Sequence, residues 1–303
     1  MVSNKLKERF CKDCKIPISI FEEPYFTDRI KLYDKMYNSL AKWNLFLQEI
    51  SKYNNEQDYL EEYNRVKDCA IDDIKNSEAY KVFNTEDMNK YAVTHKNMPG
   101  KDIFKPSFDG ETFISIDMKK ANFHSLRNYN PEIFGGAENW EQFIARYTSN
   151  KHIMNSKYIR QVILGNCNPK RHITYEKYLM DKVLDRLGSL DNVVFFSNDE
   201  IVIHIINSDE LNYSREYKTN LENTLSDFEI PLRLELFTLY KIHGADGYCK
   251  KKDDGSVELK CLDSFMIPFV LRKLYGEEVT DSDKVFFHQG LKSQVVDIPK
   301  IEI

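Results

Sequence analysis

The chain has 303 residues, of which 42% are hydrophobic and 30% are charged, and its formal net charge is −5 at pH 7. This length and hydrophobic content favour a folded protein with a large core and argue against intrinsic disorder. No run approaches the ~18 apolar residues of a membrane-spanning helix, and residues 1–9 lack the apolar segment of a signal peptide. We therefore expect a cytoplasmic protein with no membrane partner.

The first features along the chain are two cysteines, Cys11 and Cys14, whose spacing is that of half a zinc site. Cys249 and Cys261 could supply the other half if the two ends of the chain meet. A chain of this size with six cysteines and no signal peptide favours reduced thiols over disulfides. We therefore favour two unrelated pairs of thiols over a structural Zn²⁺ site.

The N-terminal third is predicted to be helical. Apolar residues recur at helical spacing from Ile30 to Trp43, and a second helical stretch runs from Glu56 to Ile74. A connector marked by proline and glycine, residues 97–110, follows. We therefore predict a helical N-terminal lobe over residues 1–95.

The next part of the chain predicts an α+β domain over residues 96–245. A strand at 112–117 leads into interrupted helical sequence from 119 to 187. Next come two strands, 193–197 and 200–206, which a short polar turn joins. A helix over 209–226 and a last strand over 230–240 follow. This order is the ferredoxin-like βαββαβ arrangement, and it leaves residues 246–303 as a small C-terminal extension.

Two carboxylates stand at strand ends in this scheme. Asp117 ends the first strand, and Asp199 lies between the two strands of the middle hairpin. The first strand of a βαββαβ sheet can lie beside that hairpin, so the two residues would form one site. Two close carboxylates repel each other, and this repulsion either raises the pKa of one of them or recruits a divalent cation such as Mg²⁺ or Mn²⁺. Glu200 is expected to point to the opposite face. The alternative is a polar turn and a strand-end aspartate without a role.

Basic residues between these carboxylates predict contacts with phosphate. Residues 151–180 carry six Lys or Arg against one Glu, although the negative net charge argues against a polyanionic partner. On a helix over 156–164, one face would present Lys157, Arg160 and Gln161 to a triphosphate, unless it is an ordinary solvated face. Candidates for a nucleic-acid backbone are Lys170, Arg171, Lys250, Lys251 and Lys252, although the last three most simply form a solvated turn.

Three segments of the chain resemble, in order, motifs A, B and C of palm-domain nucleic-acid polymerases. They are residues 116–125 around Asp117, the basic helix that ends in Gly165, and residues 196–203 around Asp199. The third is similar to the His-Asp-Glu motif of A-family DNA polymerases, with Asn198 in place of the His. The short interval between the two aspartates looks more like reverse transcriptases.

The resemblance implies a palm with inserted fingers-like helices and a thumb-like extension over 246–303. Asp117, Asp199 and Glu200 would be catalytic, and the two aspartates would hold metal. Lys157, Arg160 and Gln161 would bind the nucleotide, and Asn122 and Phe123 stand where these families sense the sugar.

The implied activity is nucleotidyl transfer, most simply DNA or RNA polymerisation from nucleoside triphosphates on a primer-template. The same site would also suit a template-independent nucleotidyltransferase or a nucleotide cyclase. A non-catalytic, nucleic-acid-binding replication accessory protein is a third possibility, because a fold does not by itself fix a function.

Overall fold

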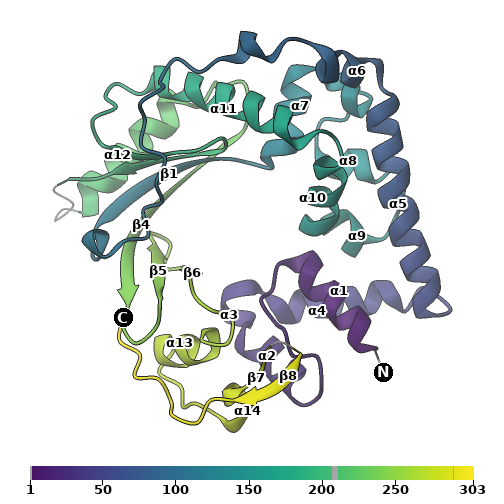
Figure 1. Cartoon of the computed structure of the whole chain (residues 1–303), viewed down its shortest axis with the longest axis vertical. Coiled ribbons are helices and arrows are strands. Elements are labelled where there is room, and N and C mark those ends of the chain that lie inside the picture. Colours follow the sequence, from purple (N-terminus) through teal and green to yellow (C-terminus); the bar gives the residue numbers. More distant parts are fainter. Residues whose placement is uncertain (1, 207–210, 289) are drawn as a thin grey trace.

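A computed structural model describes residues 2–206, 211–288 and 290–303 of this mixed α/β protein. Over these residues, one sheet of six strands and a separate two-stranded ribbon are surrounded by helices (Figure 1). The strands of the larger sheet are β1 (Thr112–Met118), β2 (Val193–Phe196), β3 (Glu200–His204), β4 (Leu232–Ile242), β5 (Gly247–Lys252) and β6 (Val257–Lys260). The ribbon consists of β7 (Val285–His288) and β8 (Leu291–Gln294).

The larger sheet has the strand order β2-β3-β1-β4-β5-β6, and every neighbouring pair is antiparallel. The first four positions follow the order of the βαββαβ arrangement, so this part of the prediction is confirmed. The sheet then continues through β5 and β6, which the sequence had assigned to a separate extension. Strand β4 is 11 residues long, and β5 pairs with its C-terminal part, from Phe237 to Ile242, and so covers the backbone groups of that part of the edge.

The two faces of the sheet differ because side chains alternate along each strand. Ile114, Ile116 and Met118 of β1 point to the face that packs against helices, and all three are buried in the main core. Asp117 lies on the other face, together with Glu200 and Arg233, its direct partners on β3 and β4. The sheet therefore presents charged side chains on the side that its helices leave open.

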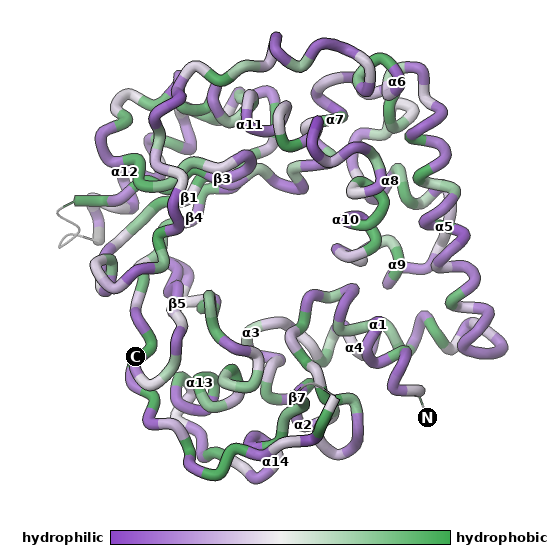
Figure 2. Tube along the Cα trace, in the orientation of Figure 1, coloured by the Kyte–Doolittle hydropathy of each residue, from purple (hydrophilic) through white to green (hydrophobic). Residues whose placement is uncertain are grey.

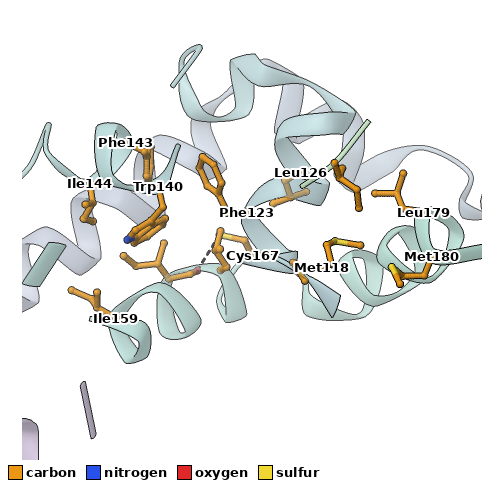
Figure 3. Packing of buried hydrophobic residues seen from close by; sticks show 14 of the residues in the cluster. Met118, Phe123, Leu126, Trp140, Phe143, Ile144, Ile159, Cys167, Leu179 and Met180 are labelled. Carbon is orange, nitrogen blue, oxygen red and sulfur yellow. Dashed lines mark hydrogen bonds between the residues drawn. The ribbon is translucent and has the colours of Figure 1, made fainter. Parts of the chain in front are cut away.

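Between β1 and β2 the chain forms a helical insertion. Its aromatic residues make a tight core in which Trp140 and Phe143 lie close to Phe123 (Figure 3). The centroid of the Phe134 ring lies 4.5 Å from that of Phe123. The elements are α7 (Ala121–Tyr129), η3 (Pro131–Phe134), α8 (Trp140–Ile144), α9 (Lys151–Asn155), α10 (Lys157–Gly165) and α11 (Pro169–Arg186). Helix α12 (Leu211–Thr224) follows β3, and residues 209 and 210 of the predicted helix lie outside the described residues.

The N-terminal segment is helical, as predicted. Its elements are α1 (Asn4–Cys14), α2 (Tyr25–Leu32), α3 (Asp34–Tyr37), α4 (Ser39–Ile50), α5 (Glu56–Asn76), α6 (Glu78–Thr85), η1 (Met88–Tyr91) and η2 (Pro106–Phe108). Figure 1 shows α5 running along one side of the molecule, from the region of α4 to α6. Most of α5 is hydrophilic (Figure 2), and its buried residues recur at helical spacing from Tyr59 to Ile74.

The predicted boundary near residue 95 does not separate two cores. Helices α1 and α5 pack against α10 of the insertion, and a single hydrophobic cluster extends from Leu6 to Leu271. The buried stripe of α5 explains this arrangement, because α1 to α4 do not cover it alone. Residues 1–95 therefore belong to the same packed body as the sheet and its insertion.

The C-terminal elements pack against the N-terminal helices. Helix α13 (Ile267–Leu274) and helix α14 (Asp281–Lys284) lie against α2, on the side of the molecule opposite α11 (Figure 1). Arg29 of α2 is buried there and donates to Asp283 at 2.8 Å and to three backbone carbonyls. The predicted extension over 246–303 is thus divided: β5 and β6 join the sheet, and the remainder forms one unit with residues near Arg29.

Within the described residues, no helix combines the length and the apolar composition needed to cross a membrane.

Candidate functional site

A cavity of about 540 Å³ opens between the end of β1, the β2–β3 turn and helix α10. It brings together six residues that the sequence predicted for catalysis or nucleotide binding, from three separate parts of the chain. These residues are Asp117, Asn122, Lys157, Arg160, Gln161 and Asp199. Met118, Lys119, Lys120, Ala121, Leu164 and Arg233 complete its walls.

The two aspartates reach this cavity from different backbone settings. Asp117 is the sixth residue of β1, and its side chain is 26% exposed. Asp199 lies in the turn between β2 and β3, where the Ser197 hydroxyl donates to its carboxylate at 3.2 Å. The backbone amide of Met118 donates to the Asp199 carbonyl at 2.9 Å, which fixes the turn against the end of β1. The turn and the strand end are therefore held together by the main chain.

The electrostatic balance at Asp117 suits a cation. Burial raises the pKa of Asp117, the Arg233 guanidinium opposes this shift, and the Asp199 carboxylate adds to it. Mg²⁺ is commonly held by one or two carboxylates together with substrate phosphates, and this donor set fits Asp117 and Asp199. Over the part of the chain that the structure describes, no group of three or more His, Cys, Asp or Glu side chains is arranged to hold a metal ion.

Glu200 does not point away from Asp117, in contrast to the prediction. The strand β3 begins at Glu200, whose Cα pairs directly with that of Asp117, so both side chains lie on one face of the sheet. The alternation of side chains along a strand does not apply to Asp199 and Glu200, because Asp199 lies in the turn and only Glu200 belongs to β3. Burial raises the pKa of Glu200, and Lys250 opposes the shift. Glu200 is not among the residues that line the cavity.

Helix α10 carries the cationic wall of the cavity. Its first turn is capped by Ser156, whose hydroxyl oxygen accepts from the Ile159 amide at 3.0 Å. The same hydroxyl donates to the buried carboxylate of Asp13 at 2.8 Å, which ties α10 to α1. Lys157, Arg160 and Gln161 then face the cavity, while Ile159 is buried. The amphipathic spacing read from the sequence places these three residues together.

The charges on this wall repel one another. Burial lowers the pKa of Lys157, the cations of Arg160 and Lys15 lower it further, and the Asp117 carboxylate opposes the shift. Burial also lowers the pKa of Arg160, and Glu141 opposes the shift. An anion bound in the cavity would relieve this repulsion, because it would place negative charge between the two cations.

Of the two predicted sugar-sensing residues, only Asn122 lines the cavity. Phe123 is fully buried, and its ring packs against Phe134 in the core of the insertion. Figure 3 shows Phe123 close to Trp140 in this core. Consecutive residues of a helix point in directions about 100° apart, and in α7 this difference turns Asn122 towards the cavity and Phe123 towards the core. Phe123 is therefore a core residue in this structure, and only Asn122 reaches the cavity at the predicted position.

Three of the residues predicted to contact a nucleic-acid backbone have partners within the protein. Arg171 donates to the carbonyls of Phe83 and Glu86 and so joins α11 to α6. Lys250 is 5% exposed, and its Nζ lies 4.0 Å from the centroid of the Phe237 ring, where a nucleic-acid strand cannot reach it. Lys252 is paired with Glu235 and Glu258. Lys170 and Lys251 are exposed.

The cysteines do not meet across the chain ends. Cys11 is buried in the main core beside Cys14, whereas Cys249 is buried in a different cluster next to α13. Burial raises the pKa of Cys14 to about 12, which disfavours the thiolate that a zinc ion requires. The two pairs therefore do not form the four-cysteine site considered from the sequence.

Sequence reasoning missed three residues at this site. Arg233 of β4 donates to Asp117, and Lys120 of the β1–α7 turn pairs with Glu141 at 2.6 Å. Glu176 of α11 is 2% exposed and accepts from the side-chain amide of Asn198 at 2.7 Å, beneath the turn that holds Asp199. Its position within the basic stretch 151–180 was visible in the sequence, but its partner was not.

The comparisons with known proteins identify no family. No family model and no solved structure matches this chain. An uncharacterised protein of Dictyostelium discoideum is 22% identical over 191 residues, which cover 63% of this chain and 78% of that protein. This similarity is too low to place the chain in a family, and it says nothing of an activity.

Proposed function

We propose that this chain is a metal-dependent nucleotidyltransferase that extends a nucleic-acid primer along a template. The observation that carries the proposal is the cavity in which Asp117 and Asp199 lie opposite Lys157 and Arg160. Carboxylates suit a divalent cation, and a cationic wall suits the phosphates of a nucleoside triphosphate. The order of the three sequence segments that resemble palm-polymerase motifs supports the same activity.

Asp117 and Asp199 would hold Mg²⁺ or Mn²⁺ in this proposal. The bound cation would neutralise charge that develops on the phosphoryl group and lower the pKa of the attacking hydroxyl. Lys157 and Arg160 would bind and orient the triphosphate, and Asn122 would lie near its sugar. The hydrogen bond between the backbones of Met118 and Asp199 would keep the two carboxylates at a fixed relative position while substrates bind and products leave.

The activity is tested with a labelled primer-template, Mg²⁺ or Mn²⁺, and separate pools of deoxynucleotides and ribonucleotides. We expect extension by the wild type and none by Asp117→Ala or Asp199→Ala, with thermal stability retained because both side chains are partly solvated. Asp191→Ala, which changes an exposed aspartate just before β2, is the matched control and should remain active. Incorporation near the wild-type rate in either site variant would refute the two-carboxylate assignment.

The same experiment separates the alternatives. Product formed from nucleotides alone would favour a template-independent nucleotidyltransferase or a cyclase, which the negative net charge of the chain also suits. Nucleic-acid binding without any product would favour an accessory protein.

A further inference from the structure

We propose that Arg233 is a third phosphate-binding residue, which stays paired with Asp117 until a divalent cation binds the Asp117 carboxylate and displaces the guanidinium. The inference rests on the proposed function, since it assumes that Asp117 binds a metal. It assigns to Arg233 two successive partners inside one cavity: the carboxylate first, and then the phosphate chain of the substrate.

The pairing of β1 with β4 places Arg233 directly opposite Asp117. One guanidinium nitrogen, Nη2, donates to Asp117 Oδ2 at 2.8 Å, while Nη1 lies 3.7 Å from Glu235 Oε1. This is a single hydrogen bond rather than the two-pronged pairing that a guanidinium can make with a carboxylate. The guanidinium of Arg233 therefore occupies a position that a metal ion bound to Asp117 Oδ2 would need.

The contact with Asp117 is easily broken. The Arg233 side chain is 51% exposed, and exposed ion pairs contribute roughly 0–1 kcal/mol because water and salt screen them. A divalent cation carries twice the charge of the guanidinium and binds carboxylate oxygen directly. The two cations compete for one oxygen, so metal binding would release Arg233.

A released Arg233 stays within the cavity. It lines the same walls as Lys157 and Arg160 and comes from the strand that borders Asp117. Its planar fork of donors fits phosphate oxygens, and arginine remains charged at any working pH. Three cationic side chains would then surround the phosphates of the metal-bound substrate.

The proposal predicts effects of opposite sign in one variant, Arg233→Met, which keeps the length of the side chain but removes its charge. In the first titration, Mg²⁺ is added without triphosphate and the melting temperature is followed. The Mg²⁺ concentration that gives half of the maximal rise in melting temperature should fall by up to about fivefold, because the competing Arg233 guanidinium, worth ~1 kcal/mol, is absent. With Mg²⁺ saturating, inorganic triphosphate should bind about tenfold more weakly, because a charge-assisted contact is lost.

Arg186→Met is the matched control. Arg186 is 41% exposed and pairs with Asp227 at 2.6 Å, but it does not line the cavity. Its replacement should change neither titration. A role of Arg233 in stability alone would shift the melting temperature of the metal-free protein and leave both ligand titrations unchanged.

Two failures are distinguishable. If Mg²⁺ stabilises the wild type, if Asp117→Asn removes that effect, and if Arg233→Met leaves either titration unchanged, this inference is overturned and the proposed function stands. If Mg²⁺ gives no stabilisation that depends on Asp117, the metal site is overturned, and the proposed function and this inference fall with it.

Discussion

Glu176 is an ionisable side chain buried close to the site. It is buried under the β2–β3 turn, its Oε2 accepts from Asn198, and its Oε1 has no hydrogen-bond partner among the residues that the structure describes. Burial raises its pKa to about 7, the Asn198 amide opposes this shift, and the Asp199 carboxylate adds to it. At neutral pH this residue therefore changes charge next to the turn that carries Asp199.

The raised pKa of Glu176 predicts a pH-dependent stability. The unfolded chain loses this proton near the ordinary pKa of glutamate, about 4.3, and the folded chain keeps it until about 7. The folded state binds more protons between these values, so the free energy of unfolding should fall as pH rises through this window. The total effect is of the order of 3 kcal/mol.

Glu176→Gln should remove most of this slope, which denaturant titrations at pH 4.5 to 7.5 would measure. Glu132→Gln, at an exposed position, is the control and should keep the wild-type slope. A wild-type stability that does not change across the window would contradict the assignment.

Helix α10 should act as a unit in substrate binding. Lys157→Ala and Arg160→Ala are each expected to raise the nucleotide KM or lower kcat by ~10-fold or more, because a charge-assisted contact contributes about 1.5–3 kcal/mol. Steady-state extension assays measure both constants. Lys151→Ala, an exposed lysine of the neighbouring helix α9, controls for a general loss of positive charge. Wild-type constants in both variants would make α10 an ordinary surface helix.

Elements with a strong local pattern were predictable. The apolar run that ends at Asp117 gave β1, and the paired runs on both sides of Asp199 gave the β2–β3 hairpin. The alternation of basic and apolar residues gave α10 and the face that lines the cavity. Each of these features repeats within a few residues, so the sequence alone carries it.

Features that depend on register or on distant partners were not predictable. The side of the sheet that Glu200 occupies follows from its pairing with Asp117, and a shift of one residue would reverse it. The contact of Arg233 with Asp117 depends on the register between β1 and β4 in the same way. Phe123 and Asn122 are neighbours in sequence, yet only the packing of α7 decides which of them faces the core.

At the scale of the whole molecule, the unit formed by α2 and the C-terminal elements depends on one buried charge cluster. Asp283 accepts from Arg29 at 2.8 Å and from Arg272 at 2.9 Å, and it is 2% exposed. Asp283→Ala should lower the free energy of unfolding by about 3–5 kcal/mol, because it leaves a buried guanidinium without its partner. Chemical denaturation measures this change. Asp281→Ala removes an exposed pair with Lys284 and should leave stability unchanged.

The proposed function and the charge distribution together predict how a primer-template would bind. Despite the net charge of −5, primer-template should bind at low salt through the basic residues of 151–177, and affinity should fall steeply as counterions are released. Fluorescence anisotropy between about 50 and 200 mM salt measures the slope. Lys170→Ala should make the slope of affinity against salt concentration shallower. Lys251→Ala tests the second predicted set of backbone contacts, residues 250–252, in which Lys251 is exposed and its neighbours are paired. A salt-independent affinity would contradict backbone contacts.

The pairing of Arg29 with Asp283 also constrains how the protein is made. The two residues are 254 positions apart, and a ribosome adds roughly 5–20 residues per second, so Arg29 is synthesised on the order of tens of seconds before its partner. During that interval α2 carries a cation that belongs in the interior but has no counter-charge. The side of α2 that carries Arg29 therefore cannot reach its final environment until Asp283 has been synthesised, whereas the packing of Phe26 against Trp43 of α4 can form much earlier.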